Sequence, residues 1–203
     1  MKIDTASIDS VILYFEERIC EEVLDQVQHA YSILKTLPNI INLTPSYHSV
    51  LVEYNIFKYE SHSIKQSIEE VLASSPYIMG VTEGKLIEIP VDYTKGLDLE
   101  RVAKIHDLKP SEVVAKHTAK TYRVYAVGFM VGFAYLANID DAIATPRLDS
   151  PRSKVPKGSV AIAESQTAIY PQQSAAGWNI IGHTEFDDFE LFEIGDSVRF
   201  VAI

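Results

Sequence analysis

The 203-residue sequence is poor in cysteine and in positive charge, with Cys20 alone and 18 Lys and Arg against 28 Asp and Glu. A single cysteine cannot form an internal disulfide, which fits a reducing compartment. The net charge of -10 argues against general binding to nucleic-acid phosphates. The longest uncharged run, between Arg123 and Asp140, is too short to span a bilayer. The first ten residues lack the apolar stretch of a signal peptide. We therefore expect a cytoplasmic protein that binds neither nucleic acid nor membrane.

Several motifs of common enzymes are also absent. The sequence contains no G-x-x-x-x-G-K-[ST] loop, no G-x-G-x-x-G and no G-x-S-x-G. Its 6 histidines do not fall at metal-ligand spacing, and there is no H-E-x-x-H or C-x-x-C, so we expect no metal site. These absences argue against a stand-alone metalloenzyme, Walker-type ATPase or serine hydrolase. They indicate an unusual pocket, an active site shared with another chain, or a protein-binding surface.

What is present begins with a pattern of alternating elements in residues 1–90. Apolar periodicity predicts strand, helix, strand, strand, helix and strand in that order, at residues 10–15, 19–34, 40–43, 49–54, 63–72 and 85–91. We place Pro45 in the turn between the middle strands, and Ser63 with Gln66 in a capping box that opens the second helix. This order is typical of a ferredoxin-like α+β domain.

Residues 91–203 are predicted to form a second, mainly β domain. A connector over residues 97–118 contains two short helices, of which Asp98 caps the first and Pro110 opens the second. Many short strands separated by Pro and Gly turns then predict a barrel or a sandwich. The predicted strands are residues 121–129, 159–163, 167–170, 178–182 and 197–202.

The stretch from Gly128 to Thr184 has a composition that a plain core does not need. Pro146, Pro151, Pro156 and Pro171 impose irregular backbone, because proline fixes φ and lacks an amide donor. Arginine, glutamine, tyrosine and tryptophan are interspersed among these turns. Irregular backbone that carries such side chains is where functional sites usually lie.

This stretch carries a resemblance to a known family. The runs HTAKTYRVYAVGF, GFAYL, ATPRLDSPRSKVPKGSVAIA, QTAIYP and GWNIIGHT closely resemble the KipI/PxpB family, whose members are also called allophanate hydrolase subunit 1 or the B subunit of 5-oxoprolinase. The likeness is nearly continuous from about residue 91 to residue 184. It implies a cyclophilin-like β-barrel for the second domain.

The resemblance also implies a function and partners. Such a chain is the B subunit of an ATP-dependent 5-oxoprolinase, which opens 5-oxoproline to L-glutamate. It shares its site with a homologous KipA/PxpC subunit (allophanate hydrolase subunit 2) and works with a LamB/YcsF-like subunit. ATP is then bound with the partner subunits, and the isolated chain holds no cofactor. The alternatives are a KipI-like inhibitor of a sensor histidine kinase and a non-catalytic relative. Prolyl isomerisation ranks below these, since fold analogy does not carry chemistry.

Two arginines are candidate substrate-binding residues. Arg147 and Arg152 stand in the two PR steps of ATPRLDSPR, and a guanidinium binds carboxylate or phosphate in a bidentate manner. The alternative is a structural pair that binds loop carbonyls or a carboxylate such as Asp149.

Polar and aromatic residues add further candidates. Gln166 and Thr167 are suited to hydrogen-bonding a lactam or amide, and Tyr170 to stacking or donating from its hydroxyl. Tyr135, with Phe133, is expected at the mouth of the pocket. The alternative for the polar residues is that they satisfy buried backbone groups.

Three further residues complete the expectations. His117, at the end of the connector helix, is the candidate general base. Its alternative role is to stabilise the helix dipole. We expect Trp178 and Phe129 in the core of the barrel.

Overall fold

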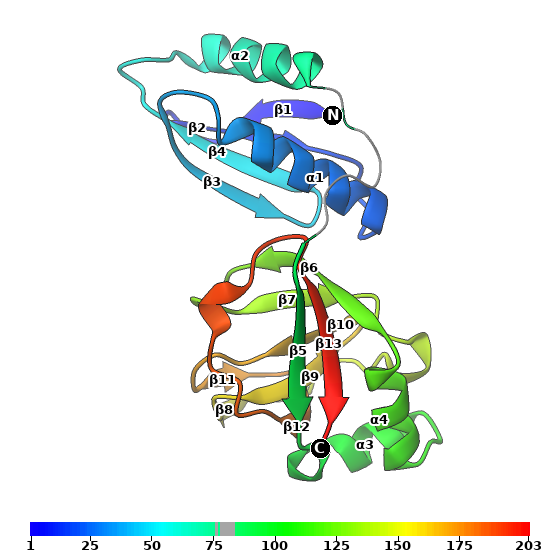
Figure 1. Cartoon of the computed structure of the whole chain (residues 1–203). Helices are drawn as coiled ribbons and strands as arrows, with labels where there is room; N and C mark the ends of the chain where they lie inside the picture. The colour runs from blue at the N-terminus through cyan, green and yellow to red at the C-terminus, as the bar shows by residue number, and fades with distance from the viewer. Residues whose placement is uncertain (76, 78–83) are drawn as a thin grey trace. The chain divides into compact units, whose positions relative to one another are not determined.

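The structure, a computed structural model, describes residues 1–75, 77 and 84–203. It consists of two compact units, Met1–Glu83 and Gly84–Ile203 (Figure 1). The division falls before the strand that we predict over residues 85–91, because that strand belongs to the sheet of the second unit. No helix in the described ranges is both long enough and apolar enough to cross a membrane.

The first unit is a four-stranded antiparallel sheet with two helices. The strands are β1 (Lys2–Thr5), β2 (Ser10–Tyr14), β3 (Ile40–Ser46) and β4 (Ser49–Tyr54), and they lie in the order β1-β2-β4-β3. Helix α1 (Glu21–Leu34) contacts β3 and β4, and α2 (Ser61–Ser74) contacts α1 and β2. Alternate residues of the central strands, such as Leu13 and Val50, are fully buried.

The ferredoxin-like arrangement of this unit is not confirmed, because its fourth strand differs from the prediction. The order β2-β4-β3 matches three strands of that arrangement. The remaining edge is occupied by β1, which precedes β2 in the chain, and not by a strand after α2. The predicted strand, β5 (Leu86–Val91), pairs in parallel with the last strand of the chain instead. A strand as short as β1 contains too few alternations to be predicted.

Two local predictions in this unit are corrected. Pro45 lies within β3, opposite Val50, and the turn follows it at residues 47–48. This position is tolerated because β3 is an edge strand. Ser63 is the third residue of α2, where its Oγ accepts a 2.9 Å hydrogen bond from the backbone N–H of Glu60. The capping box therefore begins at Glu60, and the helix begins two residues before Ser63.

The second unit is built on a seven-stranded mixed sheet in the order β12-β9-β10-β7-β6-β13-β5. The end strands meet where the backbones of Asp92 and His183 exchange two hydrogen bonds of 2.8 and 3.0 Å, so the sheet forms a nearly closed barrel. A mainly β barrel is thus confirmed. The strands are β5, β6 (Thr121–Val127), β7 (Ala134–Ala137), β9 (Ser159–Ala163), β10 (Gln166–Ile169), β12 (Asn179–His183) and β13 (Ser197–Ala202).

Shorter elements surround the barrel. Strands β8 (Arg152–Val155) and β11 (Ser174–Ala176) form a separate two-stranded sheet. Helices α3 (Leu99–Ile105) and α4 (Pro110–Thr118) correspond to the predicted connector and contact β12 and β13 respectively. Single 3₁₀ turns are η1 (Tyr93–Lys95), η2 (Asp141–Ile143) and η3 (Phe189–Leu191).

Strand β9 shows how the barrel acquires two apolar faces. Val160 and Ile162 point into the main core, whereas Ala161 and Ala163 belong to a second cluster that contains Phe133, Tyr170 and Trp178. Successive side chains of a strand point to opposite faces. The small alanines leave room for the aromatic rings, so the fold places an aromatic cluster on the outer wall of the barrel.

Candidate functional site

A cavity of about 300 Å³ opens on this aromatic wall. Its volume is at the lower end of the range of about 300–1,000 Å³ typical of ligand pockets. The lining comes from the β6–β7 loop, from β7, from the residue after β10, from the turn before β8 and from the segment around β11. The residues that line it are Phe129, Phe133, Tyr135, Arg147, Pro151, Tyr170, Ala175, Ala176, Gly177 and Trp178.

Phe133 contacts three of the aromatic rings that form the walls of the cavity. Its ring meets those of Tyr135, Tyr170 and Trp178 in edge-to-face contacts, with centroids 4.8, 5.3 and 5.9 Å apart. Only 2% of Phe133 is exposed. Edge-to-face pairs of this kind prefer one geometry, so the walls are preorganised.

Arg147 supplies the cation of the cavity. Its guanidinium carbon lies 5.8 Å from the centroid of the Trp178 ring, within range of a cation–π interaction. Two hydrogen bonds hold the backbone on either side of it: the Leu148 N–H donates to Gly177 O at 2.7 Å, and Asn179 Nδ2 donates to Pro146 O at 2.9 Å. Within the described ranges Arg147 forms no ion pair with a carboxylate.

The two tyrosines of the cavity remain protonated at neutral pH. Burial raises the pKa of Tyr170 to about 12, with a further increase from Tyr135 and a smaller decrease from Arg147. Burial likewise raises the pKa of Tyr135, against a decrease from Arg147. The cavity thus combines one cation and protonated hydroxyls with apolar walls. This combination suits a small carboxylic acid.

Arg152 lies outside the cavity. Its guanidinium donates in a bidentate manner to Asp98, with Nη1–Oδ2 and Nη2–Oδ1 distances of 2.9 and 2.6 Å. Asp98 Oδ2 also accepts from the Ile180 N–H at 2.7 Å. Asp98 stands at the N-cap position of α3 but makes no side-chain cap bond. Arg152 therefore ties β8 to α3 and β12, which favours the structural alternative with Asp98 in place of Asp149.

His117 and Thr167 also lie away from the cavity, in the interior of the unit. His117 is 0% exposed, with Nδ1 2.7 Å from the Tyr93 hydroxyl and Nε2 2.9 Å from Thr167 Oγ1. Thr167 Oγ1 donates to Ala161 O at 3.0 Å, so its oxygen is free to accept from His117 Nε2–H. Tyr93 then donates to Nδ1, and every group is satisfied with a neutral ring. This geometry favours a structural role for both residues over a general base and a substrate contact.

Burial lowers the pKa of His117 from 6.5 to about 3, which predicts a pH dependence of stability. In the unfolded chain His117 binds a proton below pH 6.5, whereas in the folded chain it stays neutral down to about pH 3. This contribution to the free energy of unfolding is therefore full above pH 6.5 and is lost as the pH falls from 6.5 toward 3. We expect the free energy of unfolding of the wild type to lose about 1.4 kcal/mol per pH unit in this range relative to His117→Gln. Urea unfolding of both proteins at pH 5, 6 and 7 measures it. If the free energy of unfolding depended on pH equally in the wild type and in His117→Gln, the result would contradict a buried neutral histidine.

The remaining candidates divide between the cavity and its surroundings. Tyr135 and Tyr170 line it, as does Phe133. Gln166 is half-buried at the start of β10 and does not line it. The prediction that Phe129 belongs to the core is wrong: it is 66% exposed and its φ is 70°, because the loop after β6 turns the ring outward.

Trp178 and Phe129 are the aromatic cavity residues that the sequence does not predict, because it suggests only core positions for both. Trp178 is 5% exposed, as expected of the core, yet it also lines the cavity. Its position as the only tryptophan, directly after Gly177, is the available signal. In the part of the chain that the structure describes, no three His, Cys, Asp or Glu side chains come together as a metal-ligand set.

The chain as a whole resembles known proteins of one family. A family model for the carboxyltransferase domain, subdomain C and D, matches residues 1–195. The B subunit of 5-oxoprolinase from Bacillus subtilis (strain 168) is 35% identical over 223 residues, which cover 100% of this chain and 92% of that protein.

Solved structures show the same fold inside longer chains. TTHA0988 is 31% identical with a TM-score of 0.84, and the match covers 97% of this chain but 40% of that one. This chain therefore spans less than half of TTHA0988. The urea carboxylase of Kluyveromyces lactis matches with a TM-score of 0.76 over 99% of this chain and 21% of that one, and at 14% identity it shows the fold alone.

Proposed function

Since this chain belongs to the family of 5-oxoprolinase B subunits, we propose that it is the B subunit of an ATP-dependent 5-oxoprolinase that converts 5-oxoproline to L-glutamate. The observation that carries the proposal is a cavity of substrate size with Arg147, free of any acidic partner within the described ranges, over an aromatic wall. The likeness to the Bacillus subtilis protein, which extends over 92% of that protein, supports it.

The cavity offers complementary groups to each part of 5-oxoproline, a five-membered lactam with one carboxylate. The Arg147 guanidinium binds the carboxylate, and a charge-assisted bidentate pair fixes its orientation. The hydroxyl of Tyr170 donates to the lactam oxygen, since its pKa of about 12 keeps the proton in place. The rings of Phe133 and Trp178 pack against the apolar edge of the lactam. The role of this chain is therefore to bind and orient the substrate.

The chemistry itself requires more than this cavity. Its polar side chains are Arg147, Tyr135 and Tyr170, and none of them accepts a proton at neutral pH, because the tyrosine pKa values are raised and arginine stays charged. The sequence also has no phosphate-binding loop for ATP. We propose that a homologous KipA/PxpC subunit completes the site, that a LamB/YcsF-like subunit takes part, that ATP binds with these partners, and that the complex is cytoplasmic.

Reconstitution tests the proposal. The chain is purified with the KipA/PxpC and LamB/YcsF-like subunits from the same source, and glutamate formed from 5-oxoproline is measured with and without ATP. We expect glutamate only when ATP and all three chains are present. The matched control omits this chain and keeps the other two. Absence of ATP-dependent glutamate from the complete mixture would refute the proposal.

A further inference from the structure

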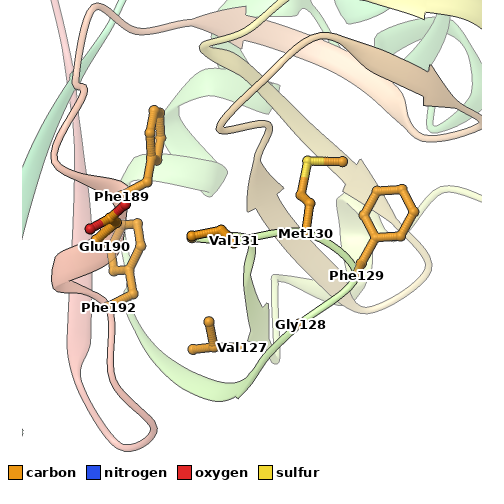
Figure 2. A pocket seen from close by; sticks show the side chains of 9 residues that line it. Val127, Gly128, Phe129, Met130, Val131, Phe189, Glu190 and Phe192 are labelled. Carbon is orange, nitrogen blue, oxygen red and sulfur yellow. The ribbon is translucent and has the colours of Figure 1, made fainter.

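A second hollow, of about 640 Å³, lies next to the substrate cavity. One side is the β6–β7 loop, residues 127–132, and the other is the segment of η3 with Phe189, Glu190 and Phe192. Figure 2 shows the side chain of Val131 pointing from the loop toward Phe189 and Phe192. Phe189 and Phe192 are 4% and 6% exposed and form the apolar floor.

The rim of this hollow exposes large apolar side chains to solvent. Val131 is 77% exposed and Phe129 is 66% exposed, and both line the hollow. Contiguous exposed apolar groups of this kind mark interaction sites on soluble domains. Phe129 also holds a φ of 70°, which is unfavourable for a bulky residue. Burial of these groups by a partner would offset the cost of exposing them.

The loop is fixed against η3, so the hollow is a preformed feature. Gly132 has a φ of 78° and lies so close to η3 that a Cβ there would be 2.6 Å from the Cβ of Phe189. The N–H of Phe133 donates to Met130 O at 3.1 Å, and that of Gly128 donates to Phe133 O at 3.0 Å. A surface of fixed shape loses little conformational entropy when a partner binds.

The charges around η3 define the chemistry of the partner. Glu190 lines the hollow, and Asp188 and Glu193 are exposed beside it. In the described ranges these three carboxylates have no ion-pair partner, whereas Asp187 is paired with Lys157. A second copy of this chain, with its net charge of -10, would bring like charges together. The rim instead complements a segment that carries lysine or arginine.

We propose that this hollow, residues 127–132 with Phe189, Glu190 and Phe192, is the docking surface for the companion KipA/PxpC subunit, which inserts an apolar side chain flanked by basic residues. Phe129 lines both this hollow and the substrate cavity, so a chain seated here covers the mouth of the cavity. The inference rests on the proposed function for the identity of the partner.

The test measures the affinity of the purified chain for the purified KipA/PxpC subunit by titration calorimetry, without substrate or ATP. Val131→Glu and Glu190→Lys are each expected to weaken binding at least tenfold, because one places a charge on the apolar contact and the other repels the basic flank. Leu97→Glu is the matched control, since Leu97 is 63% exposed in the same unit but lies outside the hollow. Its affinity is expected to stay within twofold of the wild type.

The possible outcomes distinguish failure of the docking surface from failure of the proposed function. Unchanged affinity in both hollow variants, or no binding of the KipA/PxpC subunit to the wild type, overturns the docking surface. Self-association of the wild type that Val131→Glu abolishes also overturns it, in favour of a second copy. Thermal melts confirm that each variant is folded. A wild-type complex that forms but yields no glutamate refutes the proposed function and leaves the docking surface standing.

Discussion

Substitution of Arg147 by alanine is expected to lower kcat/KM for 5-oxoproline in the reconstituted complex by on the order of 100-fold. The guanidinium is the one cation of the substrate cavity and has no acidic partner in the described ranges to lose. Loss of charge-assisted hydrogen bonds to a carboxylate costs about 3 kcal/mol, which is about two orders of magnitude in rate. Steady-state glutamate formation measures this effect.

Two control variants and one optical signal make the Arg147 result specific. Lys154→Ala removes an exposed cation nearby, outside the cavity, and is expected to keep wild-type kcat/KM. Arg147→Lys keeps the charge without the bidentate geometry, so its kcat/KM is expected to lie between those of Arg147→Ala and the wild type. Since Trp178 is the only tryptophan and lines the cavity, its fluorescence reports binding of 5-oxoproline. Wild-type activity and binding in Arg147→Ala would exclude this cavity as the carboxylate site.

The largest effect on stability is expected at Asp98, where Asp98→Ala should lower the free energy of unfolding of the second unit by about 3 kcal/mol. Asp98 is 4% exposed and accepts three hydrogen bonds, two from Arg152 and one from the buried Ile180 N–H. Alanine leaves both donors without an acceptor, and an unpaired buried donor is costly. Urea unfolding monitored by Trp178 fluorescence gives the value.

Asp149 provides the matched control for Asp98. It is exposed, and it is the carboxylate that the local sequence suggests as a partner for arginine. Asp149→Ala is expected to change stability by less than about 0.5 kcal/mol, as is usual for an exposed surface site. Equal losses in the two variants would contradict the role assigned to the Asp98–Arg152 pair.

The elements of the second unit are largely predictable because their signals are local. Strand β9 occupies residues 159–163, as predicted from a short apolar run between turns. The two connector helices follow from apolar spacing and from Pro110 at the start of α4. Tyr135 and Tyr170 line the cavity, and aromatic side chains within Pro- and Gly-rich segments are typical of pockets.

Pairing between distant segments cannot be predicted in the same way. Both Arg147 and Arg152 occur in a PR step, and no local feature distinguishes them. Only the fold brings Asp98 beside Arg152 while leaving Arg147 over Trp178. His117 likewise has the sequence context of a general base, but the closure of the barrel buries it between Tyr93 and Thr167.

Periodicity, turn residues and local motifs were enough to predict the family, the helices and most of the strands. Three-dimensional contacts fixed which sheet receives β5, which arginine pairs with a buried carboxylate and which histidine is buried. These choices depend on contacts between residues far apart in the chain, and the free energy of such contacts is set by burial and partner geometry that no local pattern records.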